Sequence, residues 1–323
     1  MKQYDVVAMG ELLVDFTMNG KSRQGNELFE ANPGGAPCNV LSMLQKLGKR
    51  TAFIGKVGDD SFGRMLKNVL DEQGIHTGNL VMDAKVPTTL AFVHTAEDGD
   101  RSFSFYRNPG ADMMLRREEV NRELLRNTGI FHFGSLSMTD KDIEDTTRMA
   151  VETAKEAGAL ISFDPNLRPP LWENLDTAKE KIEYGVRQCD ILKISDDEIE
   201  FFTGMRDIDK GISWIQEKYH TPFICATMGK NGSKAFYQDH KVECKPFLRE
   251  DTIETTGAGD TFMGCVLNFI LEAGLGQTEE QQVHDMLEFA NAAASIITTR
   301  KGALKVMPDK REVLDFVNER KSE

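Results

Sequence analysis

The sequence lacks the features that would direct it to a membrane or to an oxidising compartment. No apolar run among its 323 residues reaches the 18 or more residues of a membrane span. The opening residues 1–5 contain no hydrophobic region typical of a signal peptide. The cysteines number five and form no Cys-x-x-Cys pair, which indicates reduced thiols and not a disulfide framework or a zinc site. We therefore expect a cytoplasmic protein with no membrane partner.

Positive charge and histidine are also scarce. Lys and Arg number 39 against 52 Asp and Glu, and the net charge is −13. Nucleic-acid binding needs a basic face, so we expect no nucleic-acid partner. The six histidines show no His-x-x-x-His spacing, which argues against a transition-metal site. An acidic protein can still bind a nucleotide, because backbone amides and a divalent cation neutralise phosphates locally.

Most of the chain alternates between short β-rich apolar runs and segments with helical periodicity. This pattern predicts an α/β fold with a mainly parallel sheet and helices on both faces. The expected strands are 4–9, 51–54, 130–133, 160–163, 191–194 and 223–227. The expected helices are 36–47, 62–73, 142–156, 177–188, 208–219, 260–273, 279–299 and 309–320.

Two β-like segments interrupt this alternation. Residues 12–32 read as two short strands or a hairpin, and the strands expected at 89–94 and 102–106 are separated by a polar turn at 97–100. The Pro-Gly-Gly-Ala-Pro run at 33–37 is expected to break the chain before the first helix. We predict a small β-sheet lid formed by 12–32 and 87–108. The predicted α/β core comprises 1–11, 33–86 and 109–323.

One stretch, Glu254–Phe262, combines small residues, a carboxylate and the start of a helix. The small residues Gly257, Ala258 and Gly259 let backbone amides approach an anion, and a helix N-terminus favours negative charge. Asp260 follows directly and can take a proton from an attacking hydroxyl. The stretch therefore indicates phosphoryl transfer to a small molecule.

Glu254–Phe262 also allows simpler interpretations. A tight turn followed by an Asp at a helix start is common in proteins of any function. The dinucleotide motif Gly-x-Gly-x-x-Gly fails here because Phe262 occupies its last position. A phosphate-binding loop at Gly20–Ser22 also fails, because Asp15 stands where the earlier glycine is required.

Residues 257–262 resemble the C-terminal signature of the ribokinase-like (PfkB) carbohydrate kinases. Residues 33–39 resemble the N-terminal Gly-Gly-x-x-x-Asn signature of the same family. Further similar stretches are 10–16, 105–112 and 164–172. The resemblance runs the length of the chain and is closest to bacterial fructokinases. It implies the ribokinase-like doubly wound fold and transfer of the γ-phosphoryl group of ATP to a sugar hydroxyl, most simply D-fructose to D-fructose 6-phosphate.

The sugar site follows from the residues and from this resemblance. Paired glycines let the backbone approach a sugar, and an Asn side chain offers a donor and an acceptor to neighbouring hydroxyls. Arginines at strand ends can reach an anion or a hydroxyl, and Arg168 is assigned to the substrate or to the transferring phosphoryl group. The resemblance implies sugar contacts from Asp15, Gly34, Gly35, Asn39, Tyr106, Arg107, Arg168 and Asp260.

The nucleotide side is implied by resemblance alone. Its expected contacts are Lys193, Ser195, Glu198, Thr227, Gly229, Gly232, Gly257, Gly259 and Asn291. The family has Asn where this chain has Ser195, so only Glu198 carries the expected link to Mg²⁺. The alternative for Glu198 is an acidic residue placed at a helix N-terminus by the helix dipole.

Position 254 departs from the family, which usually has Asp there as a ligand of a monovalent cation. The longer Glu254 could displace such an ion or leave it in place, so K⁺ activation is in doubt. The expected cofactors are ATP and Mg²⁺. Family members often form homodimers through their lids, and we expect the same here.

Several functions stay open at this point. A 2-keto-3-deoxygluconate kinase would need a cation for the acceptor carboxylate, which Arg107 or Arg168 could supply. A ribokinase or nucleoside kinase would share the same motifs. A catalytically silent sugar-binding regulator is disfavoured by the retained Asp260 and Gly-Ala-Gly turn. A nicotinamide-dependent dehydrogenase is disfavoured by the missing dinucleotide motif.

Overall fold

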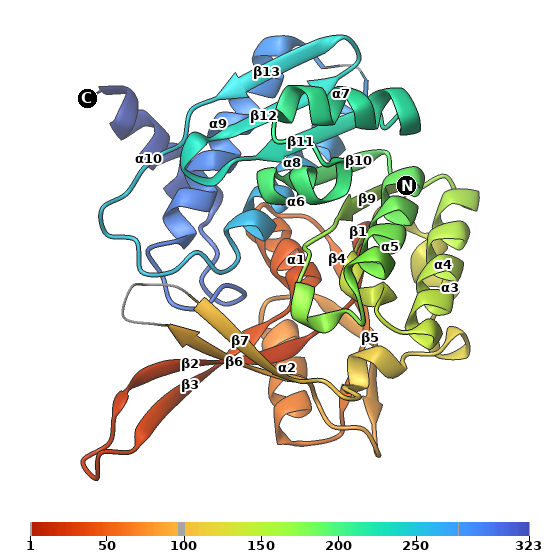
Figure 1. Ribbon diagram of the computed structural model, residues 1–323, viewed down its shortest axis with the longest axis vertical. Helices are drawn as coiled ribbons and strands as arrows, with labels where there is room; N and C mark the ends of the chain where they lie inside the picture. Colours follow the sequence, from red (N-terminus) through yellow and green to blue (C-terminus); the bar gives the residue numbers. More distant parts are fainter. Residues whose placement is uncertain (1, 96–100, 277, 323) are drawn as a thin grey trace.

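A nine-stranded sheet forms the centre of the computed structural model, which describes residues 2–95, 101–276 and 278–322. Its strand order is β13-β12-β11-β10-β9-β8-β1-β4-β5 (Figure 1). The bounds are β1 (Tyr4–Met9), β4 (Thr51–Gly58), β5 (His76–Asp83), β8 (Thr128–Gly134), β9 (Leu160–Asp164), β10 (Ile191–Ser195), β11 (Phe223–Thr227), β12 (Ser233–Tyr237) and β13 (His240–Cys244). The neighbouring pairs from β11 to β5 are parallel, which confirms the predicted mainly parallel sheet.

The sheet is larger than the sequence pattern predicted. Strands β5, β12 and β13 were not expected, and β12 and β13 extend the sheet as an antiparallel edge. β4 continues four residues beyond its expected end at Ile54, and all of its residues are buried. The extension includes Lys56 and two glycines, which argue against a strand by propensity alone. Burial between β1 and β5 overrides that propensity.

Helices cover both faces of this sheet, as predicted. They are α1 (Ala36–Lys46), α2 (Ser61–Glu72), α3 (Arg122–Arg126), α4 (Lys141–Glu156), α5 (Leu175–Gln188), α6 (Asp196–Thr203), α7 (Ile208–Tyr219), α8 (Ala258–Ala273), α9 (Glu280–Ile297) and α10 (Lys310–Ser322). Val6 and Ala8 of β1 pack in one core with α1, α2, α8, α9 and α10. Val7 and Met9 point to the opposite core, which α3 to α7 complete. Successive strand residues thus serve opposite faces.

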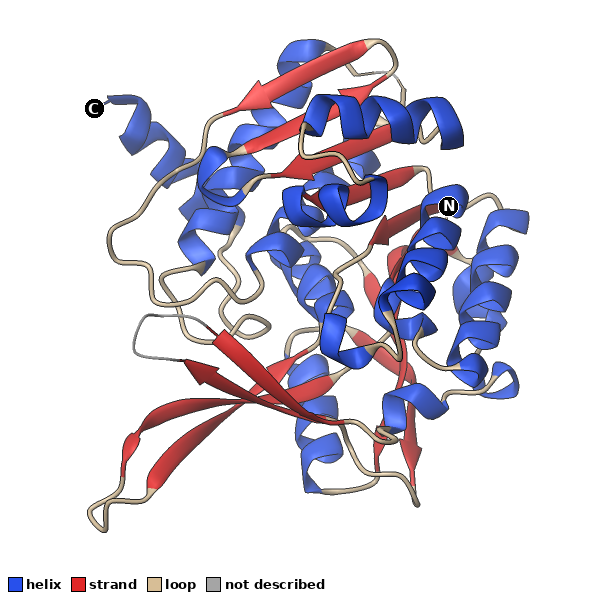
Figure 2. Cartoon of the chain, viewed as in Figure 1, coloured by secondary structure: helices blue, strands red, loops and turns tan. Residues whose placement is uncertain are grey.

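A second, smaller sheet projects from the side of this body (Figure 2). It has the order β3-β2-β6-β7, with β2 (Leu13–Lys21), β3 (Glu27–Gly34), β6 (Leu90–Thr95) and β7 (Arg101–Tyr106). The small β-sheet expected from the two interrupting segments is therefore confirmed. The expected turn at 97–100 lies outside the described residues. The assignment of the sheet as a lid, with its domain boundaries, remains a prediction.

The expected chain break at Pro33 was wrong. β3 continues through Pro33 and Gly34, which pair with Val14 and Leu13 of β2. Proline lacks an N–H donor, and β3 tolerates it because β3 is an edge strand of the small sheet. The continuation carries the chain from the small sheet directly into α1. In the part of the chain that is described, no helix has the length and apolar character needed to cross a membrane.

Candidate active site

Two clefts meet at the N-terminus of α8. The wide cleft, of about 680 Å³, lies between the small sheet and the main body, and the narrow cleft, of about 330 Å³, lies between the loop after β13 and α9. Thr255 and Gly259 line both clefts. Both open where β9, β10 and β11 end, which is the edge at which parallel α/β sheets place their ligand sites.

The loop before α8 has a shape that requires glycine. Gly257 precedes the helix with a φ of 77°, and a Cβ at this position would stand 2.5 Å from the Cβ of Ala303. Both facts disfavour any larger residue there. The first amides of a helix have no intrahelical acceptor. The amide of Ala258 donates to the carbonyl oxygen of Thr255 at 3.2 Å, which leaves the amides of Gly257 and Gly259 as the donors best able to face an anion. The anion site at residues 257–259 remains a prediction.

Asp260 lies in the first turn of α8 and is buried. Its Oδ2 accepts a hydrogen bond of 2.8 Å from Nδ2 of Asn39 in the first turn of α1. Burial raises the pKa of Asp260, and the hydrogen bond from Asn39 is the largest opposing effect. Oδ1 of Asn39 is buried and has no protein partner among the described residues. The pair therefore offers a carboxylate and an unused amide oxygen to a ligand in the wide cleft.

Close packing of α1 against α8 holds Asn39 beside Asp260. At Gly264, one turn after Asp260, an added Cβ would stand 2.7 Å from the Cβ of Met43 and 3.1 Å from the carbonyl oxygen of Val40. The absence of a side chain there permits the two helices to approach closely. The Asn39–Asp260 hydrogen bond thus depends on a glycine that does not line either cleft.

A buried ion pair stands next to the anion site. Nζ of Lys193, on β10, lies 2.9 Å from Oδ2 of Asp164 at the end of β9. Nζ also stands so close to Gly259 that an added Cβ there would be 2.9 Å away. Burial raises the pKa of Asp164 to about 6 although Lys193 opposes this. Asp164 begins one of the family-like stretches, 164–172, but no role was predicted for it; its position just after a predicted strand was the available signal.

Asp15 and Gly34 of the small sheet line the wide cleft together with Gly35, which directly follows β3, and their contact with a sugar stays a prediction. A Cβ on Gly34 would overlap Oδ2 of Asp15, so the missing side chain at Gly34 leaves the space that the Asp15 carboxylate occupies. Burial raises the pKa of Asp15 to about 7, and Arg168 across the cleft opposes the shift. The guanidinium of Arg168 donates to the carbonyl oxygen of Leu167 at 3.1 Å and lines the same cleft.

Two predicted sugar contacts are not brought into this cleft. Tyr106 is 65% exposed and does not line it. Arg107 is buried, and its guanidinium is engaged by Asp112 with an Nη2–Oδ2 distance of 2.7 Å. The sequence motif singled out Arg107, but it could not show that the nearby carboxylate of Asp112 engages the guanidinium.

Ser195 and Glu198 form a reciprocal cap at the start of α6. The two oxygens of Glu198 accept from the backbone amides of Ser195 and Leu167, at 2.9 and 2.8 Å. Neither residue lines the two clefts, whereas Lys193 lines the wide one. The described residues contain no group of three or more His, Cys, Asp or Glu that could hold a metal. Mg²⁺ commonly keeps few protein ligands and binds nucleotide phosphates, so this arrangement fits a nucleotide-borne ion.

The narrow cleft contains the remaining predicted nucleotide contacts, Thr227, Gly229, Gly232 and Asn291. The side chain of Asn291 is used by the protein itself, since it donates to the carbonyl of Lys245 and accepts from Ser233. The apolar wall of the narrow cleft was not predicted from the sequence. That wall includes Pro246, Phe247, Leu248, Phe262 and Ala294. Residues 245–253 form no regular element and match no motif, so only the fold reveals their place.

Glu254 is buried and closes a loop. Its Oε1 accepts from the backbone amide of Gly302 at 2.7 Å, and its own amide donates to the carbonyl of Thr298. One carboxylate oxygen is therefore engaged by the protein. A cation at this position would have only the other oxygen of Glu254 free.

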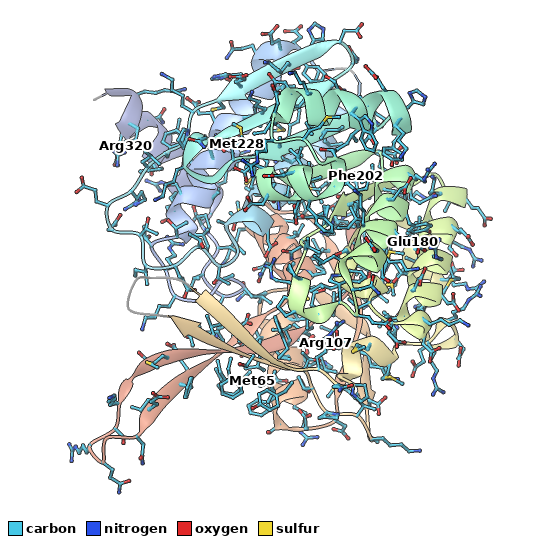
Figure 3. All side chains as sticks on the ribbon, in the orientation of Figure 1. Met65, Arg107, Glu180, Phe202, Met228 and Arg320 are labelled. Atoms are coloured by element: carbon cyan, nitrogen blue, oxygen red, sulfur yellow. The ribbon has the colours of Figure 1, made fainter. Side chains whose placement is uncertain are left out.

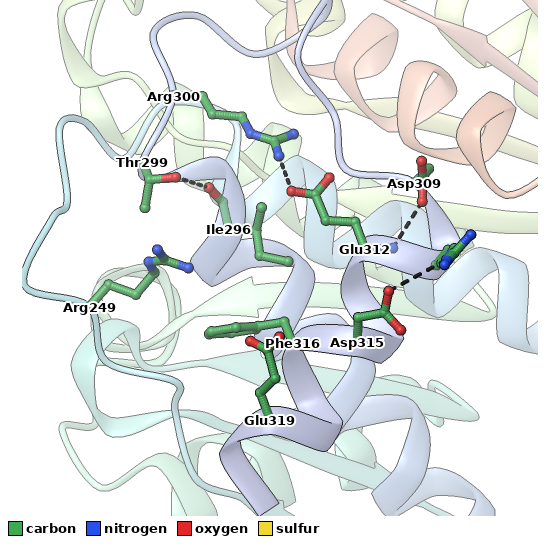
Figure 4. Close-up of a pocket in the computed structure, with 10 residues that line it drawn as sticks. Arg249, Ile296, Thr299, Arg300, Asp309, Glu312, Asp315, Phe316 and Glu319 are labelled. Atoms are coloured by element: carbon green, nitrogen blue, oxygen red, sulfur yellow. Dashed lines mark hydrogen bonds and ion pairs between the residues drawn. The ribbon is translucent and has the colours of Figure 1, made fainter. Parts of the chain in front are cut away.

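A third hollow, of about 460 Å³, lies between the end of α9, α10 and Arg249 (Figure 4). Its charged side chains largely pair with each other. Arg300 pairs with Glu312, Arg311 lies 3.5 Å from Asp315, and Arg249 pairs with Asp251 nearby. Arg249 also lines the narrow cleft. Because its arginines are already neutralised, the hollow offers no concentrated charge to a ligand.

Comparison with known proteins agrees with this architecture. Residues 3–310 match the profile of the pfkB family carbohydrate kinases, and the chain belongs to this family. It is a sugar kinase by fold and by family. Among curated relatives, it is 40% identical to fructokinase-1 of Zea mays over 314 residues, which cover 97% of each chain.

Solved structures give the same result. A fructokinase from Xylella fastidiosa with bound ATP superposes with a TM-score of 0.88 at 30% identity, covering 99% of each chain. A fructokinase from Vibrio cholerae O395, bound to fructose, ADP and calcium ion, has a TM-score of 0.87 at 28% identity. The match covers 97% of this chain and 99% of that one.

Proposed function

We propose that this protein transfers the γ-phosphoryl group of ATP to D-fructose and forms D-fructose 6-phosphate. The observation that carries the proposal is the meeting of two clefts at Thr255 and Gly259, with Asp260 beside them. The wide cleft then holds the sugar and the narrow cleft the nucleotide. The names of the relatives support this choice, since one is a fructokinase bound to fructose and ADP and another is a fructokinase bound to ATP.

In the proposed reaction Asp260 is the general base. It removes the proton of the attacking hydroxyl as the phosphoryl group transfers. Its raised pKa makes it a better proton acceptor than a solvated carboxylate, while the hydrogen bond from Asn39 and the charge of Lys193 favour its ionised form. The hydrogen bond from Asn39 also fixes the carboxylate orientation. The other oxygen of Asp260 accepts no protein hydrogen bond among the described residues and is the one assigned to the proton transfer.

Charge on the transferring phosphoryl group is stabilised by two kinds of group. The first is the set of backbone amides of Gly257, Ala258 and Gly259 at the start of α8, of which the Ala258 amide also donates to the carbonyl oxygen of Thr255 at 3.2 Å. The second is Lys193, which stands beside Gly259, together with Arg168, and both add positive charge in the wide cleft. Phosphoryl transfer depends mainly on positioning and electrostatics, so these groups supply what the reaction requires. When bound, Mg²⁺ would neutralise the phosphates of ATP.

The sugar is held by groups on both sides of the wide cleft. Asp15 accepts from its hydroxyls, Asn39 offers the unused Oδ1, and the Gly34–Gly35 backbone permits close approach. Arg168 lies among these groups and forms no ion pair with a carboxylate of the described residues, and this favours one alternative acceptor, a 2-keto-3-deoxy sugar acid. In that case Arg168 would pair with the acceptor carboxylate.

A substrate panel tests the proposal. ADP release is measured with ATP and fructose, ribose, tagatose, 2-keto-3-deoxygluconate or a nucleoside, and acceptors are ranked by kcat/KM. The product of the preferred acceptor is identified by its phosphorylated carbon. Fructose should rank first, with a 6-phosphate product. A preference for the sugar acid would favour the alternative, and ADP release that no acceptor stimulates would contradict a sugar kinase.

We also propose that the protein forms a homodimer through the small sheet. Met18, Leu28 and Tyr106 of this sheet are 45%, 46% and 65% exposed, so three large side chains with apolar surface stand in solvent on one small sheet. Burying them against a second copy would remove apolar area from water. Light scattering after size exclusion tests this. A Met18→Lys, Leu28→Lys double variant should become monomeric, and a wild-type monomer would contradict the proposal.

A further inference from the structure

Three buried side chains join both ends of the β6–β7 segment to the main body. Thr89 directly precedes β6, Arg107 directly follows β7, and Asp112 lies in the short helix η1 (Ala111–Met114). We call these three residues the root clamp. Figure 3 shows Arg107 where the small sheet joins the body. One carboxylate therefore holds the two places at which the chain enters and leaves this half of the small sheet.

The two carboxylate oxygens of Asp112 each hold one of these two places. Its Oδ1 accepts the hydroxyl hydrogen of Thr89. Its Oδ2 accepts from Nε of Arg107 at 2.8 Å and lies 2.7 Å from Nη2. The side chains of Arg107 and Asp112 are 3% and 2% exposed. A pair buried to this degree leaves a costly uncompensated charge when one partner is removed.

Arg107 extends the clamp to the wall of the wide cleft. Its Nη2 donates to the carbonyl oxygen of Leu136 at 3.0 Å, and its Nη1 donates to the hydroxyl of Thr139 at 2.9 Å. Leu136 itself lines the wide cleft. The guanidinium therefore bridges the small sheet and a segment of the cleft wall, and it does so without lining the cleft.

Close packing and further hydrogen bonds surround the root clamp and restrict its movement. A Cβ on Gly110 would overlap the hydroxyl oxygen of Thr89 and would stand 2.7 Å from Oδ1 of Asp112. The preceding residue is tied as well, because Thr88 donates to both oxygens of Asp60, at 2.8 Å each, at the start of α2. The carboxylates of Asp60 and Asp112 thus fix the two residues before β6 to the main body.

We propose that Arg107 and Asp112 are positioning residues that set the small sheet over the wide cleft. They act through Val93 of β6 and Phe105 of β7, which line the cleft, and through Leu136 on the opposite wall. If the two ends of the β6–β7 segment shift, the small sheet and the opposite cleft wall separate. The sugar then loses contacts, and water reaches the phosphoryl group. Closure that excludes water is what keeps a kinase from hydrolysing ATP. The inference rests on the proposed sugar-kinase reaction.

Two variants test the clamp, Asp112→Asn and the conservative Arg107→Lys. Steady-state kinetics are measured for both substrates, together with the ratio of ADP released to sugar phosphate formed. We expect KM for the sugar to rise about tenfold or more, KM for ATP to change less than about twofold, and the ratio to exceed one, because water competes for the phosphoryl group. Lys can reach one acceptor but not the forked set, so Arg107→Lys should show a smaller change in the same direction.

A matched control removes an ion pair that lies away from the small sheet. Glu144→Gln breaks the contacts of Glu144 to Arg148 and Lys181 on the outer helices. It should lower thermal stability and leave both KM values and the product ratio unchanged. If Asp112→Asn does not fold, Gly110→Ala disturbs the same root without removing a charged group. Hydrogen exchange of the described β6 and β7 amides gives a readout independent of activity, and exchange should accelerate there more than in β4.

The outcomes separate clearly. A rise in sugar KM with a product ratio above one, and faster exchange in β6 and β7, supports the proposal. An unchanged sugar KM and a ratio of one in folded clamp variants overturns it, as does a fall in kcat alone. Failure of the proposed function would appear differently, as absence of sugar phosphorylation by the wild-type protein. If wild type prefers another sugar, the same measurements are made with that sugar.

Discussion

The wide and narrow clefts are lined by different kinds of chemical group. Ionisable side chains from separate parts of the chain line the wide cleft, namely Glu11, Asp15, Arg168, Lys193, Glu254 and Asp260. The narrow cleft is lined mostly by small and apolar residues, and its charged side chains are Lys230 and Arg249. The wide cleft also includes residues of the small sheet, whereas the narrow cleft belongs wholly to the main body.

This difference indicates how each cleft recognises its ligand. Directional contacts from fixed side chains distinguish one sugar from another, because a buried polar group left unpaired is costly. A cleft formed by backbone turns and apolar walls recognises a shape, and it tolerates the loss of one side chain better than a change in backbone. The two clefts should therefore respond differently to substitution, and the following predictions test this in order of expected effect.

The largest effect should follow from Asp260→Asn. Loss of the general base should lower kcat by about 10²–10⁴-fold, while KM for the sugar changes much less, because Asn retains the shape of Asp. Coupled detection of ADP measures both values. Asp197→Asn, the same substitution at an exposed carboxylate of α6, should leave kcat unchanged. An Asp260→Asn enzyme with near wild-type kcat would remove Asp260 from the mechanism.

Next in size is a backbone change in the narrow cleft, Gly232→Ala. Gly232 has a φ of 88°, and a Cβ there would overlap the carbonyl oxygen of Cys244. The turn must shift, so we expect KM for ATP to rise about tenfold with little change in the sugar KM. Gly204→Ala is the matched control, since its φ is 76° and no atom lies within 4 Å of the added Cβ. Similar ATP kinetics in both variants would show that strain alone, not cleft shape, was altered.

Asp15→Asn should change both the pH dependence of the thermal stability and the affinity for the sugar, and the two effects are measured separately. The folded-state pKa of Asp15, about 7, is above its ordinary 3.8, so folding favours the protonated form. Asp15 therefore costs stability as pH rises from about 4 to 7, and that cost persists above pH 7. Asn cannot ionise, so the Tm difference between variant and wild type should be more positive at pH 8 than at pH 4.

The same variant should weaken sugar binding, with KM about tenfold higher, because Asn accepts hydroxyl hydrogens less strongly than a carboxylate. Asp145→Asn, at an exposed site on α4, should change neither KM nor the pH dependence of Tm. A Tm difference that is independent of pH would contradict the raised pKa.

The smallest effect is expected for Leu248→Ala in the narrow cleft. Leu248 is 63% exposed, so truncation removes little buried area, and KM for ATP should change less than about threefold. Leu175→Ala, which removes a leucine that is 49% exposed at the start of α5, is the control and should not affect KM. An increase above tenfold would show that the narrow cleft depends on single side chains, contrary to the contrast drawn above.

Local sequence pattern predicted most of the main sheet and its helices. Apolar runs such as Tyr4–Met9 and Phe223–Thr227 are buried on both faces, so their composition reveals them. β5 was missed because its first residues, His76 and Thr77, are polar and are followed by glycine. β12 and β13 were missed because only pairing with β11 makes them strands. Tertiary contacts decide such cases.

For the candidate site, sequence motifs identified residues at turns and strand ends but not their partners. Gly257, Gly34 and Asp15 could be found because their residue types suit the expected geometry. The engagement of Arg107 by Asp112 could not be foreseen, since a cation five residues from a carboxylate can face it or face a ligand. The contact of Asp164 with Lys193 joins residues 29 positions apart, and no local pattern encodes that contact.

Gly264 has a consequence for directed evolution of this enzyme. It contacts no ligand in the proposed reaction, yet a side chain there would push α1 from α8 and separate Asn39 from Asp260. A library that diversifies only cleft residues would leave this constraint untouched, whereas random mutagenesis would find Gly264 intolerant for no visible reason. Changes of sugar preference are therefore better sought on β2, β3 and the β6–β7 segment, which can vary while the contact between α1 and α8 stays fixed.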